Sequence, residues 1–475
     1  MEKTSGELPS IDGRWDETVD LLVVGAGAAG LSAAIFGLQS GQETLLCEKT
    51  AQVGGTTASS GGIVWAPGNR CAGHRDAGDS SDAARIYMQG EFGAHYHREL
   101  ADAFLQAAPD AIEALERANV RFSALPWPDY HPERPGGGQG GRSIEAQRFD
   151  GRRLGRMFSM VRPPLAPLML LGGMQVDKRK VDDFLNPFRS PATFFRVMRT
   201  LGRYAMDRLS FARGTDLGAG NAMVAAMLHS LLERGGKVWC NSRIVRLVRD
   251  ADGGRITGAV MQRDGRMVTV RARNGVVLAT GGFPGSPEMR EELSGEFPHD
   301  FTFGFEANVG DGIRAARAAG AALDTDVASS GYWQPCSRIR QADGAFRGVM
   351  YGYLDRGRPG VVAVDREGRR FVNEANSYHD VGLALIKAGI ARGNYFHFVC
   401  DRAFVWHHGL GMIRPYTPGL RRYARMGYIM MADTISELAA RIGVDADGLA
   451  ETIANHNRYA RTGRSEEHTS ELQSH

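Results

Sequence analysis

The stretch Val19–Gly30, VDLLVVGAGAAG, decides the fold of this chain. Its first half is an apolar run that predicts a strand over Val19–Val24, and its glycine-rich second half leads into helical spacing over Leu31–Gln39. A second run, Glu43–Cys47, predicts the next strand, and it is followed by the acid Glu48. Strand, turn, helix, strand and acid in this order are typical of a unit that binds a dinucleotide.

The three glycines of the turn have different expected tasks. Gly25 makes the tight turn, Gly27 lets the backbone approach a pyrophosphate, and Gly30 lets the helix pack closely on the strand. The helix N-terminus stabilises the phosphate charge, and Glu48, 18 residues after Gly30, is placed to accept hydrogen bonds from an adenosine ribose. The same glycine spacing recurs at Gly136–Gly141, but in a proline-rich loop with no strand before it, so we expect no nucleotide there.

Length and composition limit the classes of protein that fit. At roughly 100–200 residues per domain, 475 residues predict two to four domains. Apolar residues at 43% and charged residues at 23% exclude wholesale disorder and a bundle of membrane helices. The net charge of +3 is too small and too evenly spread to indicate a nucleic-acid or anionic-membrane partner through electrostatics alone. The 61 glycines indicate many tight turns and close approaches of the backbone to a ligand.

Cysteine usage and hydropathy predict a cytoplasmic protein without an integral membrane span. The five cysteines are scattered and form no Cys-x-x-Cys pair, so we expect a reduced protein and no metal site. We find no secretory signal and no apolar run of about 18 residues. The longest apolar candidate, Pro163–Met174, is broken by Pro and Gly; it predicts a buried loop or helix, with an apolar lip for a greasy substrate as the alternative.

The rest of the chain alternates predicted helices and strands. Helical spacing predicts helices over Ala83–Met88, Ala101–Ala118, Gly220–Glu233 (amphipathic), Asp311–Ala322 and a pair within Ala432–Ala454 that divides near Gly443. Apolar runs predict the strands Lys237–Cys240 and Ile244–Val248, a hairpin Arg255–Arg271 turning at Asp264-Gly265, the strand Val276–Ala279 and a strand pair Val361–Val372 turning at Glu367-Gly368. Leu125–Leu171 predicts long ordered loops.

A second glycine-rich segment follows the acid at residue 48. Lys49–Gly62 has the sequence KTAQVGGTTASSGG, in which two glycine pairs flank small hydroxyl residues. Such a segment lets the backbone lie against a flat ring while N–H and O–H groups reach the polar edge of the ring. Flavin enzymes need this arrangement and nicotinamide enzymes do not usually need it, so the segment indicates FAD.

On these motifs the chain, up to about Gly463, resembles the flavoprotein superfamily of fumarate reductases and 3-ketosteroid dehydrogenases. The resemblance implies an α/β fold: a Rossmann-like FAD-binding domain over 15–295 with an inserted α+β substrate domain over 296–463. It implies that FAD lies along Gly25, Gly27, Ala29, Gly30, Glu48, Lys49, Gly54, Gly55, Thr56, Thr57, Ser60, Gly61, Gly62, Val245, Thr280, Gly281, Gly282 and Asp311. Members with covalent flavin carry a His between the glycine pairs; Thr56–Ser60 has none, so non-covalent FAD is expected.

Other motifs bear on the branch of the superfamily. Gly310–Ile313 (GDGI) and Gly368–Glu374 (GRRFVNE) resemble motifs of the family's second domain. Fumarate enzymes place a dicarboxylate-binding His about 20 residues after the Gly-Asp-Gly motif, where this chain has Gly331–Pro335, GYWQP. Its aromatic pair suits a flat apolar substrate or, equally, a core position. Asp129–Pro132 (DYHP), followed by GGRS, and Asn373–Tyr378 (NEANSY) resemble the 3-ketosteroid Δ1-dehydrogenase branch.

The resemblance to that branch implies two catalytic tyrosines. Tyr378, five residues after an Asn, would be the base, and Tyr130 would assist it, although His131 could occupy the aligned place instead. The implied reaction removes two hydrogens from adjacent carbons next to a ketone, as in Δ1-dehydrogenation of a 3-ketosteroid: a proton goes to Tyr378 and a hydride to flavin N5. An external electron acceptor is expected, because the chain has no second usable dinucleotide motif. Arg370 aligns with a proton-delivering Arg of fumarate reductases, and we favour a structural role for it here.

Two alternatives follow from the resemblance and from the end of the chain. One is a fumarate-type reductase of a small unsaturated acid. The other is a truncated non-enzyme, because residues 464–475, RSEEHTSELQSH, match the in-frame translation of a sequencing adapter. In the family, the carbonyl-polarising groups and the last part of the FAD domain would follow Gly463.

Overall fold

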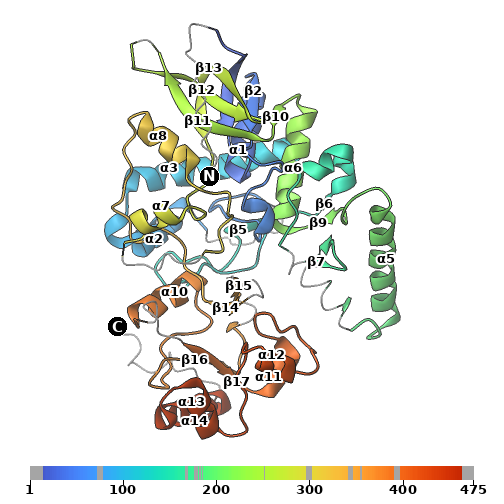
Figure 1. The fold of residues 1–475 in the computed structure, drawn as a ribbon, viewed down its shortest axis with the longest axis vertical. Coiled ribbons are helices and arrows are strands. Elements are labelled where there is room, and N and C mark those ends of the chain that lie inside the picture. The colour runs from blue at the N-terminus through green and yellow to red at the C-terminus, as the bar shows by residue number, and fades with distance from the viewer. Residues whose placement is uncertain are drawn as a thin grey trace. The chain divides into compact units, whose positions relative to one another are not determined.

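The computed structural model describes residues 14–71, 79–165, 169–175, 180, 183–184, 186–250, 252–295, 302–340, 346–352, 356–389 and 396–462. The proposed adapter-derived tail, 464–475, lies outside them. The chain divides into two compact units: the first runs to Arg290 and includes Gly304–Ala328, and the second comprises Glu291–Phe303 and the chain from Ser329 onward (Figure 1). The domain boundary expected at residues 295 and 296 stays a prediction.

The first unit is built on a mixed sheet, which in the described residues has six strands in the order β10-β2-β1-β13-β12-β11. Strands β10, β2, β1 and β13 are parallel, and β13, β12 and β11 form an antiparallel meander. The bounds are β1 Glu17–Val24, β2 Thr44–Cys47, β10 Lys237–Trp239, β11 Ser242–Arg249, β12 Ile256–Arg263 and β13 Arg266–Leu278. The predicted strands and the hairpin turn are confirmed, and the predicted strand Val276–Ala279 is the end of β13.

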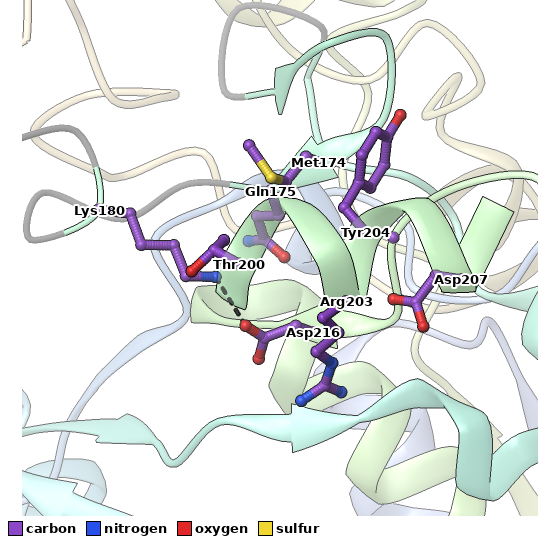
Figure 2. A pocket seen from close by; sticks show the side chains of 9 residues that line it. Met174, Gln175, Lys180, Thr200, Arg203, Tyr204, Asp207 and Asp216 are labelled. Carbon is purple, nitrogen blue, oxygen red and sulfur yellow. Dashed lines mark hydrogen bonds and ion pairs between the residues drawn. The ribbon is translucent and has the colours of Figure 1, made fainter. Parts of the chain in front are cut away.

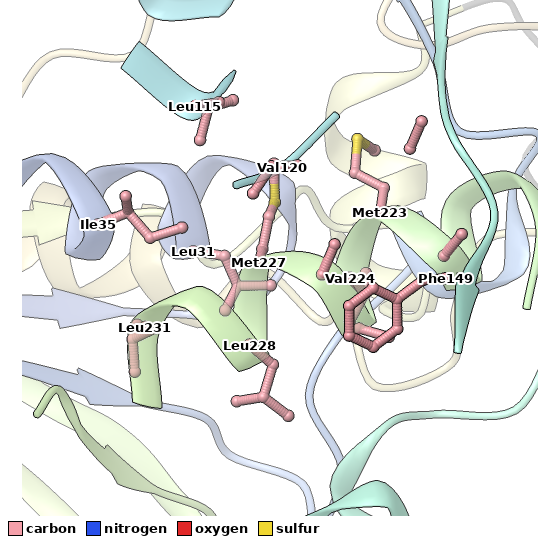
Figure 3. Packing of buried hydrophobic residues seen from close by; sticks show 14 of the residues in the cluster. Leu31, Ile35, Leu115, Val120, Phe149, Met223, Val224, Met227, Leu228 and Leu231 are labelled. Carbon is pink, nitrogen blue, oxygen red and sulfur yellow. The ribbon is translucent and has the colours of Figure 1, made fainter. Parts of the chain in front are cut away.

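Two helices form the main core of this unit. Helix α1 (Ala28–Gln39) follows β1, and α6 (Ala219–Glu233) packs against it. Figure 3 shows Leu31 and Ile35 of α1 in the same cluster as Met227, Leu228 and Leu231 of α6. Helix α6 is buried on nearly all sides, so its predicted amphipathic character is wrong. The reason is that other elements surround it: α1, β5 (Ser143–Ala146), β6 (Phe149–Asp150) and the 3-10 helices η1 (Thr57–Ser59) and η3 (Gly151–Met160).

The remaining elements of the first unit surround this core. They are η1 Thr57–Ser59, β3 Ile63–Trp65, α2 Ser81–Phe92, η2 Gly93–His95, α3 Arg98–Arg117, β4 Phe122–Ala124, β5 Ser143–Ala146, β6 Phe149–Asp150, η3 Gly151–Met160, β7 Met169–Leu170, β8 Met174–Gln175, α5 Pro191–Arg208, β9 Asp216–Leu217 and α8 Asp311–Ala318. The stretch expected as loops therefore also contains β5, β6, β7 and the 3-10 helix η3. Within the described part of the chain, no helix is long and apolar enough to cross a membrane.

The second unit contains short sheets and helices. Its elements are β14 Cys336–Arg340, β15 Phe346–Met350, β16 Val361–Val364, α10 Tyr378–Lys387, β17 His397–Cys400, α11 Arg402–His408, α12 Arg421–Arg425, α13 Ile435–Ile442 and α14 Ala446–Thr462, with α7 Pro287–Leu293 where the units divide. Helices α13 and α14 divide at Gly443 as predicted. The strand pair predicted over Val361–Val372 is wrong: β16 pairs with β17, and Val364 makes only an isolated bridge to Arg370, whose side chain binds Glu374.

Candidate active site

The carboxyl ends of the parallel strands create one edge at which the predicted cofactor residues gather. The backbone N–H groups of Gly25, Glu48 and Ala279 each donate a hydrogen bond of 2.7 Å to a carbonyl at the end of the neighbouring strand. The segments that follow β1, β2 and β13 therefore lie side by side. In open α/β sheets this edge is where nucleotides bind.

The phosphate turn has the geometry that its glycines predict. Gly25 has φ +101°, and a Cβ there would lie 2.3 Å from the carbonyl oxygen of Ala279. A Cβ at Gly30 would lie 1.7 Å from the carbonyl oxygen of Gly25, so helix α1 packs directly on the turn. At Gly27, in contrast, a Cβ would come no closer than 3.8 Å to any atom. Gly27 therefore faces open space before the N-terminus of α1, where Ala29 lies in the first turn, and this space suits a pyrophosphate.

Glu48 is fixed at the end of β2 by three hydrogen bonds. One carboxylate oxygen accepts the N–H of Ala26 at 3.1 Å, and the other accepts the N–H and the hydroxyl of Thr50, each at 2.9 Å. The residue is 7% exposed. A held carboxylate beside the phosphate turn is the acceptor that an adenosine ribose requires.

Lys49 and Asp311 meet, although they are 262 residues apart in the chain. The Lys49 ammonium lies 2.6 Å from one oxygen of Asp311, and Arg243 donates to the other oxygen at 2.8 and 3.1 Å. Arg243 was not expected from the sequence. Val245, two residues later on β11, lies at a register shift in the pairing with β12.

The doubled-glycine segment is anchored to the phosphate turn and to α6. Gly54 donates its N–H to the carbonyl of Ala26 at 2.8 Å, and the hydroxyl of Thr57 accepts the N–H of Ala28 at 3.1 Å. At its other end, the Ser60 hydroxyl accepts the N–H of Gly62 at 3.0 Å. A Cβ at the adjoining Gly61 would make only ordinary contacts, whereas a Cβ at Gly62 would clash with the backbone at the start of α6.

The segment and the turn border the same space. A Cβ at Gly55 would have the Cα of Gly27, 4.0 Å away, as its nearest neighbour. Beside Gly55, the hydroxyl of Thr56 accepts a hydrogen bond from Asn308 at 3.1 Å, and Asn308 also lies against Gly281. A flat ring on this segment and a pyrophosphate at the turn would therefore be continuous, so the residues present fit FAD.

The junction after β13 is tied to the start of α8. A Cβ at Gly312 would lie 2.2 Å from the Thr280 hydroxyl, and the carbonyl of Gly282 accepts the N–H of Gly310 at 3.2 Å. All of the expected cofactor residues thus belong to the first unit.

Tyr130, also in the first unit, follows a buried charge cluster. The carboxylate of Asp129 accepts from Arg142 and from the indole of Trp65, each at 2.7 Å, and from the Gly138 N–H at 2.8 Å. Arg142 is 2% exposed and also donates to Asp79 at 2.8 Å. The Gly136–Gly141 segment is therefore part of a loop that folds around Asp129.

The two candidates next to Asp129 differ in their surroundings. Tyr130 is 62% exposed. The ring of His131 lies 2.7 Å from a carboxylate oxygen of Glu91. The two neighbours thus differ in exposure, and the imidazole of His131 is held by Glu91.

Tyr378 is the first residue of α10, in the second unit. The hydroxyl of Ser377 caps this helix by accepting the N–H of Asp380 at 3.1 Å. The fully buried Arg356 donates to the carbonyls of Glu374 and Asn376. The segment before Tyr378 is thus held from inside the unit.

The acid of the same segment explains Arg370. Glu374 accepts the Ala363 N–H at 2.6 Å and binds Arg370 at 2.6 and 3.1 Å. Both partners of this ion pair are at least 85% buried at their side chains, at 14% and 6% exposure. This geometry supports the structural role that the sequence favoured for Arg370.

The aromatic pair also lies against α10. The N–H of Trp333 donates to the Nδ1 of His379 at 3.2 Å, and Trp333 packs on Gly382. Tyr332 stands 5.0 Å from the His379 ring, centroid to centroid, and is 81% exposed. Tyr332 is therefore not a core residue, and it neighbours the residue that follows Tyr378.

Comparisons with known proteins agree with this geometry. Residues 20–474 match the family model described as FAD binding domain. The chain is 35% identical to 4-oxocyclohex-2-ene-1-carboxylate 5-dehydrogenase of Sinomonas cyclohexanicum, over 94% of this chain and 75% of that protein. It is 32% identical to 3-oxosteroid 1-dehydrogenase of Mycobacterium tuberculosis, over 94% and 80% of the two chains.

Solved structures extend the comparison to the fold. The 3-ketosteroid Δ1-dehydrogenase from Sterolibacterium denitrificans, in complex with 1,4-androstadiene-3,17-dione, is 31% identical with a TM-score of 0.80, over 95% of this chain and 81% of that one. A flavocytochrome c3 fumarate reductase, 20% identical over 95% of this chain and 63% of that one with a TM-score of 0.54, shares the fold. The chain therefore belongs to the FAD binding domain family, and it is an FAD-dependent dehydrogenase.

Proposed function

We propose that this enzyme removes two hydrogens from adjacent ring carbons next to a ketone, with a 3-ketosteroid dehydrogenated at C1–C2 as the substrate. The observation that carries the proposal is the placement of Tyr378. It begins a capped helix, on a segment clamped by Arg356, and the next residue, His379, lies against the exposed aromatic ring of Tyr332. A base on a fixed element next to an apolar surface suits proton abstraction from a flat cyclic ketone.

The residues divide the work as follows. The phenol of Tyr378 takes the proton from the carbon next to the ketone, and Tyr130 shares or relays that proton. An ordinary phenol titrates near 10, so a partner that stabilises the ionised form helps at neutral pH. Bound FAD supplies the acceptor for the hydride from the neighbouring carbon. An external electron acceptor then completes the cycle.

A smaller cyclic ketone is a second candidate substrate. The relative from Sinomonas cyclohexanicum, at 35% identity, is named for a 4-oxocyclohexene carboxylate. Reduction of fumarate has less support: Gly331–Pro335 contains no His, and Arg370 is engaged by Glu374. The similarity to the fumarate reductase structure, at 20% identity, supports the fold alone.

The test is a substrate screen on the FAD-loaded chain with a dye as electron acceptor. We expect a 3-ketosteroid saturated at C1–C2 to lose two mass units and reduce the dye. Tyr378→Phe should lower kcat by a factor of about 100–10,000, the range for loss of a general base, with FAD retained. The matched control is Tyr416→Phe, at an exposed phenol of the same unit, which should keep full activity.

The outcomes separate the candidates. Oxidation of 4-oxocyclohexanecarboxylate without steroid oxidation would select the smaller ketone. Fumarate reduction by the reduced enzyme without oxidation of either ketone would overturn the proposal. Full activity of Tyr378→Phe would contradict the role of Tyr378 as the base but not the proposed class of substrate.

A further inference from the structure

Helix α5 presents an apolar stripe to solvent. Of its residues, Phe195 is 69%, Met198 48% and Met206 59% exposed, and Leu209, directly after the helix, is 86% exposed. At 3.6 residues per turn these four positions lie on one face, together with the exposed Gly202 and Ala205. We call this face, made of Phe195, Met198, Gly202, Ala205, Met206 and Leu209, the α5 stripe. Phe188, 83% exposed, stacks on Phe194 at the start of the helix and extends the apolar surface.

The face of α5 that points into the protein is mostly polar: its buried residues are Thr193, Val197 and Asp207. Figure 2 shows Thr200, Arg203, Tyr204 and Asp207 of α5 around a small pocket that is completed by Lys180 and Asp216 and by other residues. Asp207, 2% exposed, binds Arg152 at 2.7 Å and the Thr215 hydroxyl at 2.8 Å. A helix at a water-facing surface normally has the opposite arrangement, with apolar residues inward. The apolar face of α5 therefore has no apolar cover among the described residues.

The neighbouring hairpin has the same character. Leu171, at the turn between β7 and β8, is 66% exposed, and its carbonyl accepts a hydrogen bond from the Tyr204 hydroxyl of α5 at 2.7 Å. Leu165 is 44% exposed. Within the described part of Pro163–Met174, Pro164, Gly173 and Met174 are buried, so the segment is only in part the buried loop that its sequence favoured. Exposed apolar residues thus continue from α5 into the segment that is bound to it.

Arginines flank the stripe. Helix α5 contains Arg196, Arg199, Arg203 and Arg208, and its one acid, Asp207, is buried. Arg199 and Arg208 lie on opposite sides of the stripe, and both are exposed. Among the described residues they make no ion pair, whereas Arg196 pairs with Asp183 and Arg203 with Asp150. The overall charge of +3 hides this local excess of positive charge.

We propose that α5 is an interfacial helix that lies flat on a lipid bilayer with anionic headgroups. The stripe would enter the boundary of the acyl chains, and Arg199 and Arg208 would bind phosphate groups beside it. A basic amphipathic helix of 18 residues, about 27 Å long, has the dimensions of such an anchor. A second copy of this chain is the weaker occupant, because a symmetric contact would bring the same arginines face to face.

Vesicle flotation tests the proposal with the full-length, FAD-loaded protein. We expect the protein to float with vesicles of mixed phosphatidylcholine and phosphatidylglycerol, and binding to weaken as salt is raised. Phe195→Asp with Leu209→Asp should lower the partition constant at least tenfold, because each change removes a large apolar side chain. Arg199→Gln with Arg208→Gln should lower it about 30-fold on anionic vesicles and little on pure phosphatidylcholine.

The matched control is Leu100→Asp, which places the same charge at another helical leucine of the first unit, 70% exposed on α3. It should float like the wild type, and all variants should keep FAD absorbance and the wild-type circular dichroism spectrum. Absence of flotation by the wild type overturns the proposal. If the wild type also forms a dimer in light scattering, and Phe195→Asp with Leu209→Asp dissociates that dimer, the α5 stripe binds a second copy of the chain in place of a membrane. Equal flotation of the stripe variant and the wild type also overturns it.

Discussion

Single glycines decide whether the phosphate turn can form. An alanine at position 30 would place its Cβ 1.7 Å from the carbonyl oxygen of Gly25, so helix α1 and the turn would have to separate. We expect Gly30→Ala to lose bound FAD and to lower the free energy of unfolding by roughly 3 kcal/mol or more, the upper part of the usual cost of overpacking. Visible flavin absorbance and denaturant unfolding measure the two effects.

Gly90 provides the control for that substitution. It lies within helix α2, and no atom lies within 4 Å of a Cβ built there. Gly90→Ala should therefore raise the free energy of unfolding by about 0.5–1 kcal/mol through helix propensity, with FAD retained. If both alanine variants behaved alike, the close packing at Gly30 would not be what the turn depends on.

At the scale of single residues, some members of the site could be predicted from the sequence and others could not. Gly25 and Gly30 were predictable, because turn and packing tasks follow from a local pattern that the structure confirms. Arg243 and Asn308 were not, because their contacts join residues 68 and 252 positions apart in the chain. No periodicity links such positions; only the folded sheet brings them together. The contacts of all these residues with FAD stay predictions.

At the scale of elements, α10 couples Tyr378 to a histidine that responds to pH. The Nδ1 of His379 accepts the N–H of Trp333, so this nitrogen carries no proton in the folded protein. Burial lowers the pKa of His379 below its ordinary 6.5, against a smaller opposite effect of Asp380. Because its folded pKa lies below the unfolded one, its contribution to stability is present above 6.5 and is lost as the pH falls toward the folded value. We expect the KM for a ketone substrate to rise and thermal stability to fall on acidification below pH 6.5.

An asparagine at position 379 tests whether His379, and not another histidine, causes this pH dependence. Its side-chain oxygen can accept from Trp333 without titrating, so His379→Asn should flatten the dependence of KM on pH and keep kcat near neutrality. His407→Asn, at an exposed histidine of α11, should leave the pH profile unchanged. An unchanged KM profile in His379→Asn would show that the contact between His379 and Trp333 does not act on the substrate.

Helices and strands with a clear local sequence pattern could be predicted, but which strands pair with one another could not. Strands β1 and β2 follow directly from apolar runs, and helix α1 follows from helical spacing. The partner of β16 was missed, because 32 residues separate the end of β16 from the start of β17 and nothing in either strand specifies the pairing. Helix α5 was missed as well. Its apolar stripe faces outward while Asp207 is buried, and such a pattern does not identify which face a fold will bury.

At the scale of the whole molecule, the cofactor residues and the proposed base are divided between two compact units. Every expected FAD contact lies in the first unit, from the turn at Gly25 to Asp311, whereas Tyr378 lies in the second. From its length the sequence predicts two to four domains, and the family resemblance implies two. The return of residues 304–328 to the first unit depends on contacts such as that between Lys49 and Asp311, which no local pattern contains.

This division predicts where FAD stabilises the protein. A ligand that binds only the folded state at 100 times its Kd adds about 2.7 kcal/mol, equivalent to about 100-fold slower opening exchange. We expect FAD to slow amide hydrogen exchange by up to that factor in β1, β2 and β13, whose ends form the cofactor edge. The strands β16 and β17 of the second unit should exchange at nearly the same rate with and without FAD. The measurement is hydrogen exchange by mass spectrometry on apo and reconstituted protein, with Gly30→Ala as a chain that should show no FAD effect. Equal protection of both sets of strands would mean that the two units open as one, and the cofactor would then stabilise the whole molecule.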